Sequence, residues 1–231
     1  MTRNFLFTRS GMTNLLKFQR HHFADVRISD SEFKDRFIVI AHRRRINHLV
    51  VVAGPTSSGK STLIKAMMSN QLPELAASLG IENVKGWLAT DANAVAELID
   101  RDVDGLILHY DFLMPYRRRT RSYYDDKAFH LLEAAREVSF VTLWTPPPRL
   151  ERQLLKGELR SPQRRRKDRH LLHIYRQPSE VLKFYHDWFE FCGSRGSKMN
   201  KHIIVEFDRN LKVYSLEEWE HTTRNYESGR E

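Results

Sequence analysis

The sequence has almost no cysteine and no long apolar run. Its 231 residues include one cysteine, Cys192, and no apolar stretch close to the roughly 20 residues that a membrane-spanning helix needs. A single cysteine excludes an internal disulfide and a zinc site made of cysteines alone, and it suits a reducing compartment such as the cytoplasm. Glycine and proline are also scarce, with 10 and 8 residues, which excludes a collagen-like chain. Because 41% of the residues are hydrophobic and 11% aromatic, we expect a well-packed domain.

Acidic residues are outnumbered by basic ones. The chain has 38 Lys and Arg residues against 29 Asp and Glu, a net charge of +9. Such an excess attracts polyanions, namely nucleic acid, anionic lipid or phosphorylated small molecules, although a solvated surface would explain any single basic cluster equally well. The clusters are Arg43–Arg45, Arg117–Arg119 with Arg121, and Arg164–Arg166 with Lys167 and Arg169.

Predicted strands alternate with predicted helices along most of the chain. The run Leu49–Ala53 is apolar and β-branched, which is typical of a strand buried on both faces. Further strands are predicted at 84–89, 105–110, 139–144 and 202–207, with helices at 60–70, 92–101, 124–138, 150–159 and from 178 onward. Thr145 is predicted to cap the helix that follows the fourth strand. This alternation predicts an α/β fold in which helices cover both faces of a parallel sheet.

The first 46 residues differ in composition from the rest. Residues 1–24 carry four Arg or Lys and no Asp or Glu, and residues 35–41 could form an extra strand. An organellar transit peptide would have this composition, and so would a basic amphipathic arm. We therefore predict a basic N-terminal arm over 1–46 and a single domain over 47–231.

One segment carries a specific motif. Residues 54–61 read GPTSSGKS and match the phosphate-loop pattern G-x-x-x-x-G-K-[ST] at every position, between a buried strand and a helix. The two glycines let the backbone approach phosphate oxygens, and the N–H groups of the loop and of the helix N-terminus attract the anion. In this pattern Lys60 reaches the β- and γ-phosphates, Ser61 can ligate Mg²⁺, and Thr62 faces the α-phosphate. The predicted nucleotide-binding residues are Gly54, Pro55, Thr56, Ser57, Ser58, Gly59, Lys60, Ser61 and Thr62.

With this loop, the chain resembles the P-loop nucleoside-triphosphate hydrolase superfamily, and within it the small-molecule and nucleotide kinases. The resemblance spans residues 49–207 and rests on the loop and on the order of strands and helices. It implies a three-layer fold with a five-stranded, mainly parallel sheet, a helical lid at about 149–177, and the use of ATP and Mg²⁺. Three features of other P-loop proteins are absent from the sequence: the Asn-Lys-x-Asp motif of GTPases, the Leu-Ser-Gly-Gly-Gln motif of transport ATPases, and an acidic residue directly after Asp111, which motor ATPases use to activate water. Their absence argues against those three classes.

Two aspartates follow predicted strands, at the edge where open parallel sheets bind ligands. The resemblance implies that Asp91 orients or deprotonates an acceptor hydroxyl, whereas capping of a helix that begins at Ala92 is the alternative. Asp111 ends the third strand, as a Walker B carboxylate does, and is predicted to hold Mg²⁺ together with Ser61. The alternative for Asp111 is an ion pair with Arg117–Arg119.

The arginine-rich segment after the fourth strand resembles a kinase lid. In such kinases, lid arginines neutralise the charge that develops on the transferred group. We predict that Arg152 and Arg164 take this role, with Lys60 and Asp91 as the other catalytic residues. Arg117–Arg119 could clamp an anionic acceptor, because guanidinium groups match phosphate and carboxylate geometry.

Three functions remain open from the sequence. The leading hypothesis is an ATP- and Mg²⁺-dependent phosphotransferase that acts on a small hydroxylated or phosphorylated acceptor. The loop is also similar to that of tRNA isopentenyltransferases, which would make nucleic acid the partner. The third hypothesis is a binding module in which ATP only orders the lid.

Overall fold

The computed structural model describes residues 46–91, 102–113, 123, 129, 131–160, 162–194, 199–208 and 210–227, without the side chains at 158–160, 162–167, 200, 225 and 227. The predicted strand at 35–41 and the predicted helix at 92–101 lie outside these residues, as do the arginines at 117–119 and 121. Those three predictions stay predictions.

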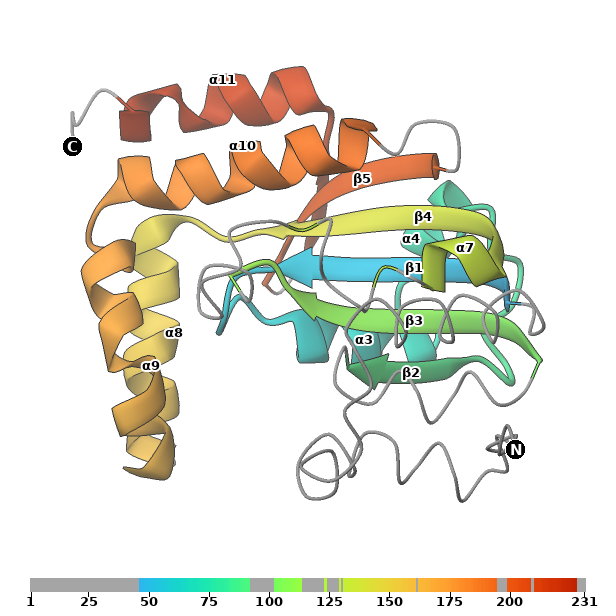
Figure 1. Ribbon diagram of the computed structural model, residues 1–231, viewed down its shortest axis with the longest axis horizontal. Helices are drawn as coiled ribbons and strands as arrows, with labels where there is room; N and C mark the ends of the chain where they lie inside the picture. Colours follow the sequence, from blue (N-terminus) through green and yellow to red (C-terminus); the bar gives the residue numbers. More distant parts are fainter. Residues whose placement is uncertain are drawn as a thin grey trace, which may run out of the picture.

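The described part of the chain is built on one six-stranded sheet (Figure 1). The strands are β1 (Ile46–Gly54), β2 (Leu88–Asp91), β3 (Val103–Asp111), β4 (Ala135–Trp144), β5 (Met199–Phe207) and β6 (Leu211–Tyr214). Their order across the sheet is β2-β3-β1-β4-β5-β6. The first five strands are parallel, and β6 pairs with β5 in the antiparallel direction. The predicted α/β class with a mainly parallel sheet is confirmed, with one strand more than the five predicted.

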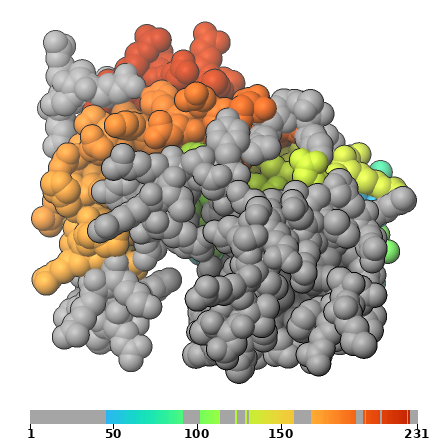
Figure 2. Space-filling model, in the orientation of Figure 1, coloured from blue at the N-terminus to red at the C-terminus, as the bar shows by residue number. Residues whose placement is uncertain are grey.

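Helices cover both faces of the sheet. On one face, α3 (Lys60–Met68) and α4 (Pro73–Ser78) pack on an aliphatic cluster. On the other face, α7 (Leu131–Ala134), α10 (Pro178–Ser194) and α11 (Leu216–Glu227) pack on an aromatic cluster. The central strand β1 is buried from both sides, which explains why its residues 49–52 are all apolar. Figure 2 shows α10 in orange and α11 in red side by side on the molecular surface.

Two further helices project from the end of the sheet at which the parallel strands finish. They are α8 (Pro147–Arg160) and α9 (Pro162–Tyr175), and they run side by side as a hairpin (Figure 1). Each of α8, α9 and α10 begins with a proline. The N–H group of a first helical residue has no partner within the helix, so proline, which lacks an N–H group, is well tolerated there. The prolines therefore mark where each of the three helices begins.

Three details differ from the sequence-based expectation. The predicted helix 124–138 ends early, because residues 135–138 belong to β4. Helix α4, strand β6 and helix α11 were not predicted; β6 has only four residues, too few for an alternating pattern to be recognised. The capping role predicted for Thr145 is wrong, since its hydroxyl donates to the carbonyl of Ser58 and α8 begins at Pro147.

Candidate functional site

The segment Gly54–Thr62 connects β1 to α3 at the carboxyl end of the sheet. Its backbone turns through two left-handed residues, Ser57 with φ 66° and Gly59 with φ 102°. A Cβ atom at Gly54 would lie 2.8 Å from Ser58 Oγ and 3.1 Å from the Leu143 carbonyl oxygen. The two glycines of the motif are thus required for different reasons: Gly54 by close packing, and Gly59 by its backbone conformation.

Side chains from the region of the α8–α9 hairpin hold the carbonyl groups of this loop. The Tyr175 hydroxyl donates to the Thr56 carbonyl at 2.6 Å, and the Thr145 hydroxyl donates to the Ser58 carbonyl at 3.1 Å. The side-chain nitrogen of Gln153 donates to the Ser57 carbonyl at 2.5 Å, in the amide orientation in which the Gln153 oxygen accepts from Arg149. In a planar trans peptide the N–H group points opposite to the C=O group, so the N–H groups of Ser57 and Gly59 are directed away from these anchoring side chains.

Lys60, the first residue of α3, folds back onto the loop. Its Nζ atom donates to the carbonyls of Gly54 at 2.9 Å and Pro55 at 2.7 Å. Burial lowers the pKa of the Lys60 ammonium group, and the nearby negative charge of Asp111 opposes that decrease. A buried cation therefore lies within the loop that was predicted to hold phosphate.

Asp111 lies against the same loop. Strand pairing places it opposite Gly54, and its carboxylate accepts hydrogen bonds from the Thr56 hydroxyl and, at 3.1 Å, from the Leu113 N–H group. Ser61 lies in the first turn of α3 and is exposed. The structure thus brings together the loop, Lys60 and Asp111.

Asp91 and His109 extend this group of polar residues along the sheet edge. Asp91 ends β2, is exposed, and is paired in register with His109 of β3. The pKa of His109 is lowered by burial and by the positive charge of Lys60, whereas Asp111 and Asp91 act to raise it. The strand register places His109 beside Asp91, and the charges of both aspartates act on it, which no local pattern in the sequence indicates.

The predicted lid arginines are placed differently. Arg152 is an exposed residue of α8, and no hydrogen bond or ion pair joins it to the loop within the described part of the chain. Arg164 lies in α9, and its side chain is not among those described. The hairpin residues that do contact the loop are Gln153 and Tyr175, neither of which the sequence pattern marks.

Arg149 anchors the base of the hairpin to the end of β5. Its guanidinium donates to the Phe207 carbonyl at 3.0 Å and pairs with Asp208 at 3.0 Å and Glu206 at 3.6 Å. The Gln153 amide oxygen accepts from Arg149 Nε at 3.2 Å. A continuous set of hydrogen bonds therefore runs from the end of β5 through α8 to the Ser57 carbonyl.

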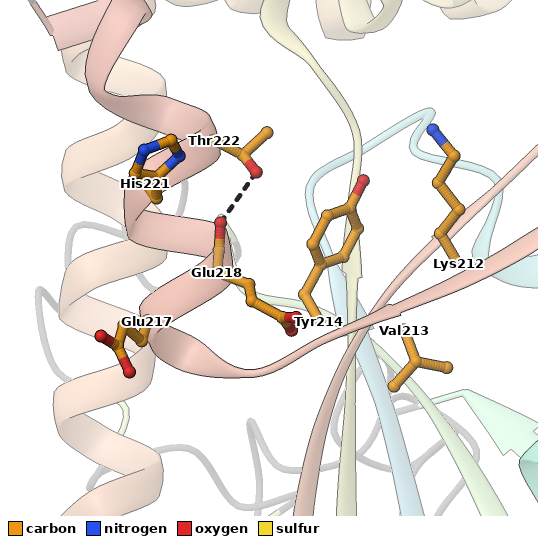
Figure 3. A pocket seen from close by; sticks show the side chains of 7 residues that line it. All are labelled: Lys212, Val213, Tyr214, Glu217, Glu218, His221 and Thr222. Carbon is orange, nitrogen blue, oxygen red and sulfur yellow. Dashed lines mark hydrogen bonds between the residues drawn. The ribbon is translucent and has the colours of Figure 1, made fainter.

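A second concave surface lies elsewhere, between β6 and α11 (Figure 3). Figure 3 shows the Thr222 hydroxyl bonded to the Glu218 carbonyl at 2.7 Å on the α11 side. This open groove contains none of the predicted site residues. It is lined by Lys212, Val213, Tyr214, Glu217, Glu218, His221 and Thr222.

Comparison with protein-family models found no match, and comparisons with curated proteins and with solved structures found none either. Within the described ranges, no three or more His, Cys, Asp or Glu side chains are grouped closely enough to hold a metal ion. None of the described helices combines the length and the hydropathy needed to cross a membrane.

Proposed function

We propose that the protein is an ATP- and Mg²⁺-dependent phosphotransferase acting on a small hydroxylated or phosphorylated acceptor. The observation that carries this proposal is the loop Gly54–Thr62, whose carbonyl groups are held by surrounding side chains. N–H groups directed away from those side chains, the helix N-terminus and a buried Lys60 supply the positive potential that a polyphosphate needs.

The other residues have roles that follow from their positions. Lys60 would exchange its two carbonyl partners for phosphate oxygens. Its ammonium group has three N–H donors and is shielded from solvent, which strengthens its attraction to an anion. Asp91, exposed at the end of β2, would align or deprotonate the acceptor hydroxyl. Arg152 of α8 and Arg164 of α9 would neutralise charge on the transferred group.

The residues present fit a magnesium ion of the kind that nucleotide sites use. Mg²⁺ keeps several water ligands and takes one or two protein oxygens together with phosphate oxygens. Ser61 offers an exposed hydroxyl near the loop, and Asp111 offers a carboxylate that is already held by Thr56 and Leu113. When bound, the ion would neutralise phosphate charge, while the hydrogen bonds to Asp111 fix the carboxylate in place.

The test is a transfer assay with a matched pair of lysine variants. ATP labelled at the γ-phosphate is incubated with the protein and a panel of nucleosides, nucleotides and sugars, and ATP binding is measured by calorimetry. We expect transfer to at least one class of acceptor, and we expect Lys60→Ala to lower kcat by about 10²–10³-fold. Lys65→Ala, an exposed lysine of the same helix, should leave both measurements unchanged.

Two results would contradict the proposal. Absence of transfer together with unchanged ATP binding in Lys60→Ala would show that the loop does not hold a nucleotide. Tight ATP binding without transfer to any acceptor would instead identify a nucleotide-binding module. Asp91→Asn refines a positive result, because it should lower kcat while the ATP dissociation constant stays the same.

A further inference from the structure

The α8–α9 hairpin is one of two strongly basic segments of the chain. Residues 147–175 contain nine Arg or Lys and three Asp or Glu, a net charge of +6. Residues 1–46 also carry +6, with ten Arg or Lys and four Asp or Glu, so all other residues together have a net charge of −3. A uniform basic surface that serves only for solubility would not be distributed in this way.

The described side chains of the hairpin separate into a buried apolar set and an exposed basic set. Leu150, Leu154, Leu171 and Ile174 are buried. Lys156 and Arg152 on α8 and Arg169 on α9 are exposed. Leu155, 38% exposed, is the one large apolar side chain that the described part of the hairpin leaves uncovered, so the hairpin presents mainly cations to the solvent.

These exposed cations are not neutralised by the ion pairs at the base of the hairpin. Those pairs join Arg149 to Glu206 and Asp208, and Arg176 to Glu151. Within the described residues, neither Lys156 nor Arg169 takes part in an ion pair. Their charge is therefore available to an external anion.

The far half of the hairpin is too distant from the loop to serve only a bound nucleotide. Tyr175 contacts the loop, whereas positions 164–167 lie about 12–16 Å away along α9 at 1.5 Å per residue. Figure 1 shows the end of the hairpin where α8 turns into α9 projecting away from the sheet. An anion that engages both ends of this segment must be longer than a triphosphate.

We propose that the α8–α9 hairpin binds the phosphate backbone of a nucleic acid, without reading its bases. The described part of the hairpin has no exposed Phe, Tyr or Trp ring, since Tyr175 is buried, and His170 and His173 are its only exposed rings, so contacts to phosphates are the main interaction it offers. An anionic membrane is a poorer partner, because a helix that lies in a lipid surface inserts an apolar face, whereas Leu155 is the one large apolar side chain exposed in the described part of these helices. The inference goes beyond the proposed function and does not depend on phosphoryl transfer.

The experiment compares two triple variants that change the net charge equally. Hairpin variant Lys156→Gln/Lys167→Gln/Arg169→Gln removes two lysines and one arginine from α8 and α9. Control variant Lys183→Gln/Lys212→Gln/Arg224→Gln removes two exposed lysines and one exposed arginine from α10, β6 and α11. Fluorescence anisotropy measures binding of a labelled 20-nucleotide RNA and of a 20-base-pair DNA duplex between 50 and 300 mM salt, and circular dichroism verifies that both variants fold.

We expect the wild-type protein to bind with a strong salt dependence. Each phosphate contact contributes about 0.7 to the slope of log K against log salt for a single strand, so the hairpin variant should lose about 2 from that slope. If the hairpin variant and the wild-type protein bind equally at 1 M salt, a slope difference of about 2 makes the variant bind roughly 100-fold more weakly at 0.1 M salt. The affinity of the control variant should stay within about threefold of wild type. Three lost contacts would reduce the slope by about 2.7 on the duplex and by about 2.1 on the single strand, so only a slope loss on the duplex beyond this ratio would identify the duplex as the preferred ligand.

Three results would overturn the inference. They are no binding by the wild-type protein at 0.1 M salt, equal losses in the two triple variants, and loss of binding to phosphatidylserine vesicles but not to nucleic acid in the hairpin variant. Lys60→Ala separates this proposal from the proposed function, because it should weaken ATP binding and transfer and leave RNA binding intact. If no acceptor is phosphorylated while RNA binding still depends on the hairpin, only the phosphotransferase proposal fails.

Discussion

The two faces of the sheet are built from different kinds of side chain. The face under α3 and α4 is aliphatic, with Val50, Val52 and Leu63 fully buried. The face under α10 is aromatic: Trp188 is fully buried and stacks with Tyr110 and Phe112, at ring-centroid distances of 5.5 and 5.9 Å. Both faces exclude water, but only aromatic residues with polar atoms can also make hydrogen bonds inside the core.

On the aromatic face, those polar atoms bind the strand that leads into the hairpin. Trp188 Nε1 donates to the Thr142 hydroxyl at 2.8 Å. The Tyr185 hydroxyl donates to the Leu143 carbonyl at 2.9 Å and accepts from the Thr145 N–H group at 3.1 Å. The apolar side chains of α3 contribute packing to the aliphatic face, whereas hydrogen bonds on the aromatic face also hold the end of β4, where the loop-contacting segment begins.

The largest expected effect distinguishes packing from hydrogen bonding. Trp188→Ala should lower the free energy of unfolding by about 3–5 kcal/mol, and Leu63→Ala on the other face by about 2–4 kcal/mol. Chemical denaturation measures both. Milder substitutions sharpen the comparison: Trp188→Phe keeps a ring but loses the donor to Thr142 and should still cost about 1–2 kcal/mol.

The aliphatic counterpart of that milder change is Leu63→Met. It conserves volume and breaks no hydrogen bond, so it should cost less than about 1.5 kcal/mol. If Trp188→Phe proved neutral, the hydrogen bonds of the aromatic face would contribute nothing beyond packing, and the distinction between the two faces would be lost.

The next effect is a pH dependence that belongs to the aromatic face. His202 packs beside Phe140 and Phe189, its Nε2 lies 2.8 Å from the Thr142 hydroxyl, and burial lowers its pKa to about 4. Since the Thr142 oxygen accepts from Trp188, its own proton can be donated to a neutral His202. Protonation of the imidazole would remove this acceptor.

The sign of the pH dependence follows from the lowered pKa. Between pH 6.5 and 4 the unfolded chain takes up a proton that the folded protein does not, so stability is complete above about pH 6.5 and decreases as the pH falls toward 4. The loss should approach 3 kcal/mol at most. His202→Gln, which does not titrate, should show a flatter dependence than wild type in urea unfolding from pH 7 to 4. Parallel curves for the two proteins would assign the acid sensitivity to other groups, such as His48, whose pKa is also lowered by burial.

Local patterns in the sequence explain which parts of the structure could be predicted. The buried strand β1, the loop with its glycines, and the amphipathic helix α10 depend on residues close together in the chain. The anchoring of the loop does not: Thr145 and Tyr175 are 87 and 119 residues from the carbonyls that they bind. For Thr145, the local rule predicted a helix cap, and a distant carbonyl in the folded protein competed successfully for the same hydroxyl. The surroundings of His109 also depend on residues distant in the chain, because strand register brings Asp91 beside it and the charge of Lys60 acts on it from the start of α3.

The smallest expected effect tests whether the aromatic face acts on the loop through a hydroxyl group. Tyr175 belongs to the aromatic cluster, and its hydroxyl binds the Thr56 carbonyl in the interior. Tyr175→Phe keeps the ring but leaves that carbonyl without its donor, which should cost about 1–2 kcal/mol of stability. Under the proposed function, a less constrained loop should also bind ATP about 5–10-fold more weakly, because preorganised dipoles lose less entropy on binding.

Thr222→Val is the control for this last prediction. Its hydroxyl also donates to a backbone carbonyl, that of Glu218 at 2.7 Å, but within α11, where it lines the groove shown in Figure 3. Calorimetry with ATP should therefore give wild-type affinity for Thr222→Val and reduced affinity for Tyr175→Phe. Equal affinities in the two variants would mean that the Tyr175 hydroxyl is not needed to position the loop.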